Sequence, residues 1–168
     1  MFYSTTDGQY IREGQSFTIG DVQYPQNWLN HSTPEEKEAI GLEEVVATNS
    51  PKHDKYYWVS STLDGAELTY TNTPKDLDNV KSLAISEINQ IAHSILLPSD
   101  WMVVKSVETS TSIPEAWGTW RSSVRATANT AKTAISEATD VDEVQEIMSN
   151  ITWSVSYTHL TLPTILLV

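Results

Sequence analysis

The amino-acid sequence predicts an α+β fold, in which a small antiparallel β-rich N-terminal module is followed by a helical hairpin or short helical bundle. Short runs of β-branched and aromatic residues, separated by turn residues, fill the first 72 positions. From residue 77 onward, apolar residues recur at spacings of three and four, as they do on one face of a helix. The composition changes between Asn72 and Pro74. We therefore assign residues 1–72 to the β-rich module and residues 73–153 to the helical one.

Turn residues mark two hairpins in the first module. Gly20-Asp21 separates Phe17-Thr18-Ile19 from Val22-Gln23-Tyr24, and Asp64-Gly65 separates residues 56–59 from residues 68–70. Two turn residues between β-rich runs are typical of tight hairpins. We expect Trp28 and Leu29 to pack back on the first hairpin, and residues 42–47 to form a strand.

A short helix is predicted between the hairpins. Thr33-Pro34-Glu35-Glu36 fits a capping box with proline at the first helical position, and Gly41 is placed to end the helix about two turns later. Glu35, Glu36 and Glu38 could be imagined as paired catalytic carboxylates. On a short surface helix they are better explained as a solvated face that places negative charge at the helix N-terminus.

The longest predicted element is a helix of roughly six turns. Its start is signalled by Thr73-Pro74-Lys75-Asp76. The apolar stripe consists of Leu77, Val80, Ala84, Ile88, Ile91 and Ile95. Proline disfavours helical backbone angles in the residue before it, so Pro98 predicts that the helix stops near Leu97. The apolar run of residues 101–104 that follows has a strand-like composition.

A second helix is predicted after this break. Ser112 and Glu115 fit a capping box, with Pro114 in the first turn. One face then carries Trp117, Trp120 and Val124, and an adjacent face carries Arg121 and Arg125. A short last helix begins at Thr139-Asp140-Val141-Asp142.

The C-terminal tail, residues 154–168, is expected to be an artefact. Residues 155–164 read as one frame of the transposon-end adapter used in sequencing libraries, and the variable index that follows the adapter would supply residues 165–167. The alternative is a genuine apolar C-terminal strand. We expect the gene fragment to stop near Trp153 or Ser154.

Composition and motifs argue against several functions. The net charge of −12, from 22 acidic and 10 basic residues, argues against nucleic acid and anionic membranes as partners. Without cysteine the chain has no thiol nucleophile, and its histidines are scattered without metal-ligand spacing. Neither a nucleophile elbow nor a phosphate-binding glycine loop is present. We expect no enzymatic activity, no cofactor and no metal site.

The tryptophans and arginines of residues 91–125 are the candidate site. Trp101, Trp117 and Trp120 are either core side chains or anchors for a partner. Arg121 and Arg125 either pair with nearby acids or contact the partner. With Asp100, these residues form the proposed partner-binding set.

This stretch resembles the tail assembly chaperone family of tailed bacteriophages. The motif comprises a leucine pair, Thr or Ser-Asp-Trp, then Ile/Val-Pro, an aromatic residue before Arg, and a second Arg four residues later. The matching residues are Leu96, Leu97, Ser99, Asp100, Trp101, Ile113, Pro114, Trp117, Trp120, Arg121 and Arg125. Residues 17–41 also resemble the N-terminal region of marine-phage structural-gene products. Two departures are Lys105, where arginine is common, and Ala92-His93, where small residues are usual.

The resemblance implies a non-enzymatic role in virion assembly. The expected partner is a phage tail, fibre or tape-measure protein, and the expected location is the host cytoplasm during assembly or the virion tail. The alternative is a structural component of the tail or fibre that stays in the mature particle.

Overall fold

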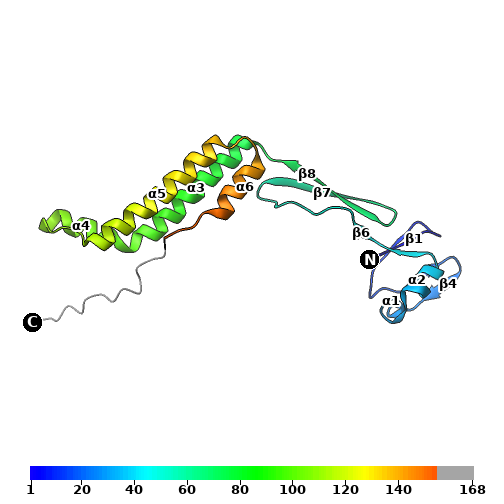
Figure 1. Ribbon diagram of the computed structural model, residues 1–168. Helices are drawn as coiled ribbons and strands as arrows, with labels where there is room; N and C mark the ends of the chain where they lie inside the picture. Colours follow the sequence, from blue (N-terminus) through cyan, green and yellow to red (C-terminus); the bar gives the residue numbers. More distant parts are fainter. Residues whose placement is uncertain (155–168) are drawn as a thin grey trace, which may run out of the picture. The chain divides into compact units, whose positions relative to one another are not determined.

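The computed structural model describes residues 1–154 and has the α+β architecture that the sequence predicts, with strands first and helices after them (Figure 1). The chain divides into two compact units, one of residues 1–73 and one that begins at Pro74. The predicted adapter-derived tail, apart from Ser154, lies outside the described residues.

The N-terminal unit contains eight strands and two short helices. They are β1 (Phe2–Ser4), β2 (Tyr10–Ile11), β3 (Phe17–Ile19), β4 (Val22–Tyr24), α1 (Trp28–His31), α2 (Pro34–Ala39), β5 (Leu42–Glu44), β6 (Val46–Ala47), β7 (Tyr57–Asp64) and β8 (Glu67–Pro74). Its small core consists of Phe2, Ile11, Phe17, Ile19, Leu29 and Leu42. The Trp28 ring packs edge-on against Phe17, with 6.0 Å between ring centroids. The predicted packing of Trp28 and Leu29 on the first hairpin is therefore confirmed.

Both predicted hairpins are present. Strands β3 and β4 pair antiparallel, with Ile19 opposite Val22, and β7 and β8 are joined at Gly65, where φ is +57°. The single strand expected over residues 42–47 is instead two strands in different sheets. Strand β5 pairs antiparallel with β1, whereas β6 pairs parallel with β8. Strand β6 thus joins the sheet formed by the β7–β8 hairpin. That sheet has the order β6-β8-β7, so β7 lies at its edge.

Helix α2 begins with the predicted capping box. The Glu36 backbone N–H donates to Thr33 Oγ1 over 3.2 Å, and the Thr33 backbone N–H donates to Glu36 Oε2 over 2.8 Å. Hydrogen bonds from its own backbone N–H and from the Thr33 side chain hold the pKa of Glu35 below its ordinary value. The helix ends before Gly41, whose φ is +75°.

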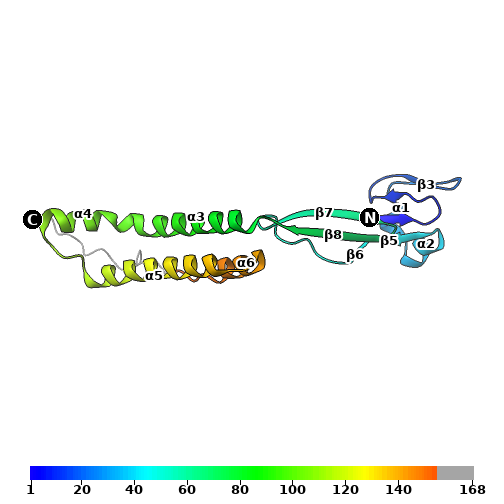
Figure 2. The same ribbon diagram turned by 90° about the horizontal axis from the view of Figure 1, so that it is seen from above.

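The second unit is helical. It contains α3 (Leu77–Leu96), a one-turn 3₁₀ helix η1 (Leu97–Ser99), α4 (Asp100–Thr109), α5 (Glu115–Glu137) and α6 (Val141–Asn150). Helices α3 and α5 run side by side, and α6 packs against both (Figures 1 and 2). The apolar core comprises Val80, Ala84, Ile88 and Ala92 from α3, Trp120, Val124, Ala128, Ala131 and Ile135 from α5, and Ala138, Val141 and Val144 at the end of the unit. The predicted stripe of α3 therefore faces α5, with Leu77, Ile91 and Ile95 only half-buried.

Helix α3 ends at Leu96, as Pro98 predicts, but the chain then continues through the one-turn η1 into α4. Two local predictions for this unit were wrong. Residues 101–104 are helical rather than extended, because a four-residue apolar run cannot by itself separate strand from helix. Helix α5 starts at Glu115 with Pro114 at its N-cap, so Ser112 does not cap it.

The start of α3 also differs from the sequence signal. The capping side chain is that of Asp76, whose Oδ1 accepts from the Asn79 backbone N–H over 2.9 Å. Thr73 and Pro74 belong to β8 instead. The strand thus continues to within two residues of the helix, and aspartate takes over the cap.

Candidate partner-binding site

Helix α4 projects from the helical unit with little of its surface covered. It follows η1 and continues roughly in line with α3 (Figure 2). None of its ten residues is buried, although Met102, Val103 and Ser106 are half-buried on its inner side. A helix of ten residues is marginal in water unless it is held by packing or polar contacts. Helix α4 therefore needs contacts from the rest of the unit to keep its position.

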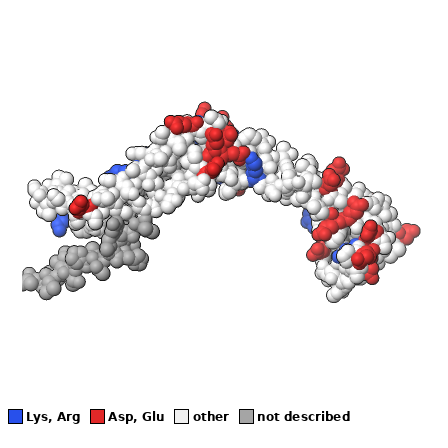
Figure 3. All heavy atoms as spheres, in the orientation of Figure 1, with Lys and Arg blue, Asp and Glu red and all other residues white. Residues whose placement is uncertain are grey.

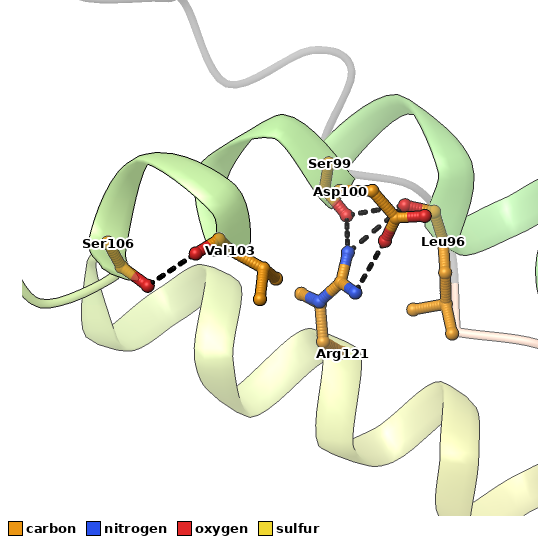
Figure 4. A network of polar contacts seen from close by, with 6 residues as sticks. All are labelled: Leu96, Ser99, Asp100, Val103, Ser106 and Arg121. Atoms are coloured by element: carbon orange, nitrogen blue, oxygen red, sulfur yellow. Dashed lines mark hydrogen bonds and ion pairs between the residues drawn. The ribbon is translucent and has the colours of Figure 1, made fainter. Parts of the chain in front are cut away.

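A polar network centred on Arg121 of α5 holds the junction of η1 and α4 (Figure 4). The Arg121 guanidinium donates through Nη1 to the Leu96 carbonyl over 3.1 Å and to the Ser99 hydroxyl. Through Nη2 it donates to Asp100 Oδ1 over 2.6 Å, which makes an ion pair. One side chain of α5 thereby binds the end of α3, the end of η1 and the first residue of α4.

Burial makes this network specific. Arg121 is only 4% exposed, and a buried guanidinium is costly unless its N–H groups are paired. Ser99 is completely buried, while the Asp100 side chain keeps 44% of its surface in solvent. Because Asp100 is partly solvated, its ion pair with Arg121 is weakened by water. The hydrogen bonds to Ser99 and Leu96 therefore contribute as much as the ion pair to holding the guanidinium in place. Arg121 thus sets the direction in which α4 leaves the unit.

The outer side of α4 is apolar. Leu97 of η1 lies four residues before Trp101 and seven before Val104, a spacing that places the three on one side, with Val107 beside them. Their exposed fractions are 55%, 53%, 56% and 78%, respectively. We call these four residues the α4 face. The Lys105 ammonium lies 6.0 Å from the centroid of the Trp101 ring, at the edge of the face.

Helix α4 carries Asp100, Lys105 and Glu108, so its net charge is only −1. On the side of the molecule drawn in Figure 3, the end of the helical unit that bears α4 is mostly uncharged. This contrasts with the chain as a whole, which has a net charge of −12. A contiguous exposed apolar surface on a small protein commonly marks an interaction site.

The other two tryptophans of the candidate set lie elsewhere. Trp120 is 5% exposed and belongs to the core, and Trp117 is half-buried beside it. Their rings meet edge to face, with centroids 5.6 Å apart. Arg125, one turn beyond Arg121, is exposed. Trp120 therefore packs in the core, whereas Trp101 lies on the surface.

The structure therefore brings four of the six candidate residues together in two pairs, Asp100 with Arg121 and Trp117 with Trp120, and leaves Trp101 and Arg125 exposed. Asp100 and Arg121 contact each other and position α4, while Trp101 points outward from the helix that they hold. Sequence reasoning missed Ser99 as a buried partner, and it missed Val104 and Val107 as part of the surface. The helical spacing of Leu97, Trp101 and Val104 is the signal that would have found the surface, had residues 101–104 been read as helix.

Across residues 1–154, no cluster of three or more histidine or carboxylate side chains could hold a metal ion. Within the same range, no helix is both long and apolar enough to cross a membrane. Comparisons with protein-family models, with curated proteins and with solved structures find no match to this chain.

Proposed function

We propose that this chain is a non-enzymatic bacteriophage tail assembly chaperone, which binds a tail, tail-fibre or tape-measure protein through the α4 face during virion assembly. The observation that carries the proposal is a helix without buried residues, held in place by a buried arginine and presenting Leu97, Trp101, Val104 and Val107 to solvent. The motif that resembles the chaperone family spans this same feature. Its Ser-Asp and first Arg build the junction, and its Trp lies on the exposed face.

The α4 face suits an apolar segment of a partner. Tryptophan is enriched among residues that dominate binding energy, because it buries a large surface with few rotatable bonds. A segment that is already helical before binding also loses less conformational entropy than a disordered one. The partner surface that we expect is accordingly an apolar groove or helix face that would otherwise be exposed before the tail is assembled.

The experiment is a pull-down with the full chain from cells that express the neighbouring genes of the same phage. A double variant, Trp101→Ala with Val104→Ala, removes the centre of the α4 face. The matched control is Leu83→Ala on α3, which changes another exposed apolar residue, 65% exposed, away from that face. We expect one tail or fibre protein to be recovered by the parent chain and by the control, and to be lost with the double variant.

Two results would contradict the proposal. One is a bait that recovers no tail, fibre or tape-measure product. The other is recovery that does not respond to the double variant, which would place binding elsewhere on the chain. Trp120→Ala is unsuitable for this test, since Trp120 belongs to the core and its loss would act through folding.

A structural component of the tail or fibre is the second candidate. The observation that favours it is the N-terminal unit, which has its own apolar core and could serve as a separate attachment module. Mass spectrometry of purified particles separates the two functions. A chaperone should be absent from mature virions, whereas a structural component should be present in stoichiometric amounts.

A further inference from the structure

Strand β7 leaves one edge of its sheet open within the described part of the chain. The sheet order β6-β8-β7 places β8 on one side of β7 and no strand of residues 1–154 on the other. At eight residues β7 equals β8 in length, and both are longer than the other strands. An open edge presents backbone N–H and C=O groups that can pair with another strand.

The devices that usually protect an edge strand are missing from β7. Residues 58–63 contain no charged residue, no proline and no glycine. Val59 and Leu63 share one face of the strand and are 37% and 41% exposed, respectively. Long, uncharged and partly apolar edges of this kind tend to be covered by another strand.

We propose that two copies of this chain pair antiparallel through β7, with Ser61 of each copy at the two-fold axis. A two-fold interface uses the same surface twice, so every contact must be self-complementary. In this register Val59 of one copy lies opposite Leu63 of the second copy, and the reverse contact forms on the other side of the axis. The two apolar residues of the face thus cover each other, and the two three-stranded sheets become continuous.

Charge favours a second copy as the occupant of this edge. Lys52 and Lys55, with Asp54 between them, precede β7, whereas Asp64 and Glu67 flank the turn at its other end. Antiparallel pairing places the net positive end of each strand beside the acidic turn of the other copy, twice per dimer. This attraction offsets part of the repulsion between two chains that each carry a charge of −12. The strand itself adds no charge between Tyr57 and Asp64.

The oligomeric state of the full chain, measured by sedimentation equilibrium over a range of concentrations, tests the proposal. We expect a reversible dimer that weakens as salt is added. Ser61→Lys places two ammonium groups side by side at the axis and should raise the dissociation constant by roughly tenfold or more. The matched control is Thr71→Lys, which adds the same charge at an exposed position of the central strand β8 and should leave the dimer unchanged.

Cross-linking tests the register. The chain has no cysteine, so a single introduced thiol reports one position only. We expect a short bismaleimide to join Ser61→Cys chains into a covalent dimer and to leave Thr71→Cys chains largely monomeric. Circular dichroism of each variant checks that the fold is kept.

Three outcomes overturn the proposal. The first is a chain that stays monomeric at every concentration, and the second is cross-linking that is equal at positions 61 and 71. The third is a dimer that resists Ser61→Lys but is lost when Trp101 is changed, which would place the contact on the α4 face. Ser61 lies outside the α4 face. A failed dimer test would therefore leave the proposed function standing, and a failed pull-down would leave the proposed dimer standing.

Discussion

At the scale of single residues, Arg121 is the side chain that ties the junction between α3 and α4 to α5. Its guanidinium is the partner of the buried Ser99 hydroxyl and also binds the Leu96 carbonyl. An arginine can serve three acceptors at once because its donors form a planar fork, and lysine cannot reproduce that geometry. The first arginine of the motif is therefore explained by the architecture of this chain, without any contact to a partner.

Replacing Arg121 should destabilise the helical unit. We expect Arg121→Met to lower the free energy of unfolding by about 2 kcal/mol, because Leu96, Ser99 and Asp100 lose their charged donor. The Ser99 hydroxyl keeps its own hydrogen bond to the Leu96 carbonyl. Denaturant unfolding followed by circular dichroism measures the loss. Arg125→Met, an exposed position one turn away, should change stability by less than about 0.5 kcal/mol. Equal effects of the two substitutions would mean that the network contributes nothing to stability.

The two tryptophans with opposite environments should separate stability from binding. Trp120 is 5% exposed, so Trp120→Ala should cost about 3 kcal/mol or more through the cavity that it leaves. Trp101 is 53% exposed, and Trp101→Ala should cost less than about 1 kcal/mol. Unfolding of both variants in denaturant gives the comparison. A large stability loss for Trp101→Ala would show that its ring is packed in solution and would remove it from the α4 face.

At the scale of elements, α4 and α6 form a natural comparison. Both have ten residues, but α6 buries Val141 and Val144 and is capped by the Asp140 side chain, which accepts from the Glu143 backbone N–H over 2.9 Å. Helix α4 buries nothing, and its N-cap Ser99 makes no capping side-chain bond. The stability of α4 rests instead on its junction with α5.

Hydrogen exchange should reveal this difference. We expect the amides of α4 to exchange faster than those of α6, because opening α4 exposes little apolar surface. Mass spectrometry of deuterium uptake, resolved to peptides, compares the two helices in one sample. Arg121→Met should speed exchange in α4 further. Equal protection of the two helices would argue against a loosely held α4.

The sequence predicted the elements that carry strong local signals. The Gly20-Asp21 turn, the Thr33 capping box and the periodic stripe of α3 each depend on neighbouring residues, and each is present. The second hairpin is also present, but its turn residues are Gly65-Ala66 rather than Asp64-Gly65, because Asp64 ends β7. The junction after Leu96 could not be predicted in the same way. Its conformation depends on Arg121, which lies 25 residues away from Leu96 in the chain and whose side chain is buried at that point.

The error at residues 101–104 follows from the same limit. Pro98 and an apolar run of four residues predict a break followed by a strand if only neighbours are considered. The break is present, since α3 ends at Leu96, but Arg121 of α5 binds the Leu96 carbonyl and the Ser99 hydroxyl, and a second helix rather than a strand follows. A tertiary contact thus overrides a local preference.

At the scale of the whole molecule, the division between Thr73 and Pro74 has a thermodynamic consequence. Each unit has its own core, Phe17 being part of one and Val124 of the other. Compact units with separate cores commonly unfold as separate transitions. A single free energy of unfolding would then not describe the chain.

Variants in the two cores test whether the units unfold independently. We expect Phe17→Ala to destabilise the N-terminal unit by about 3 kcal/mol and to leave the melting of the helical unit unchanged. Arg121→Met should destabilise the helical unit and leave the melting of the N-terminal unit unchanged. Calorimetry of the full chain, compared with residues 74–154 expressed alone, assigns each transition. One shared transition that both substitutions lower would mean that the units stabilise each other. A partner that binds one unit would then also change the stability of the other.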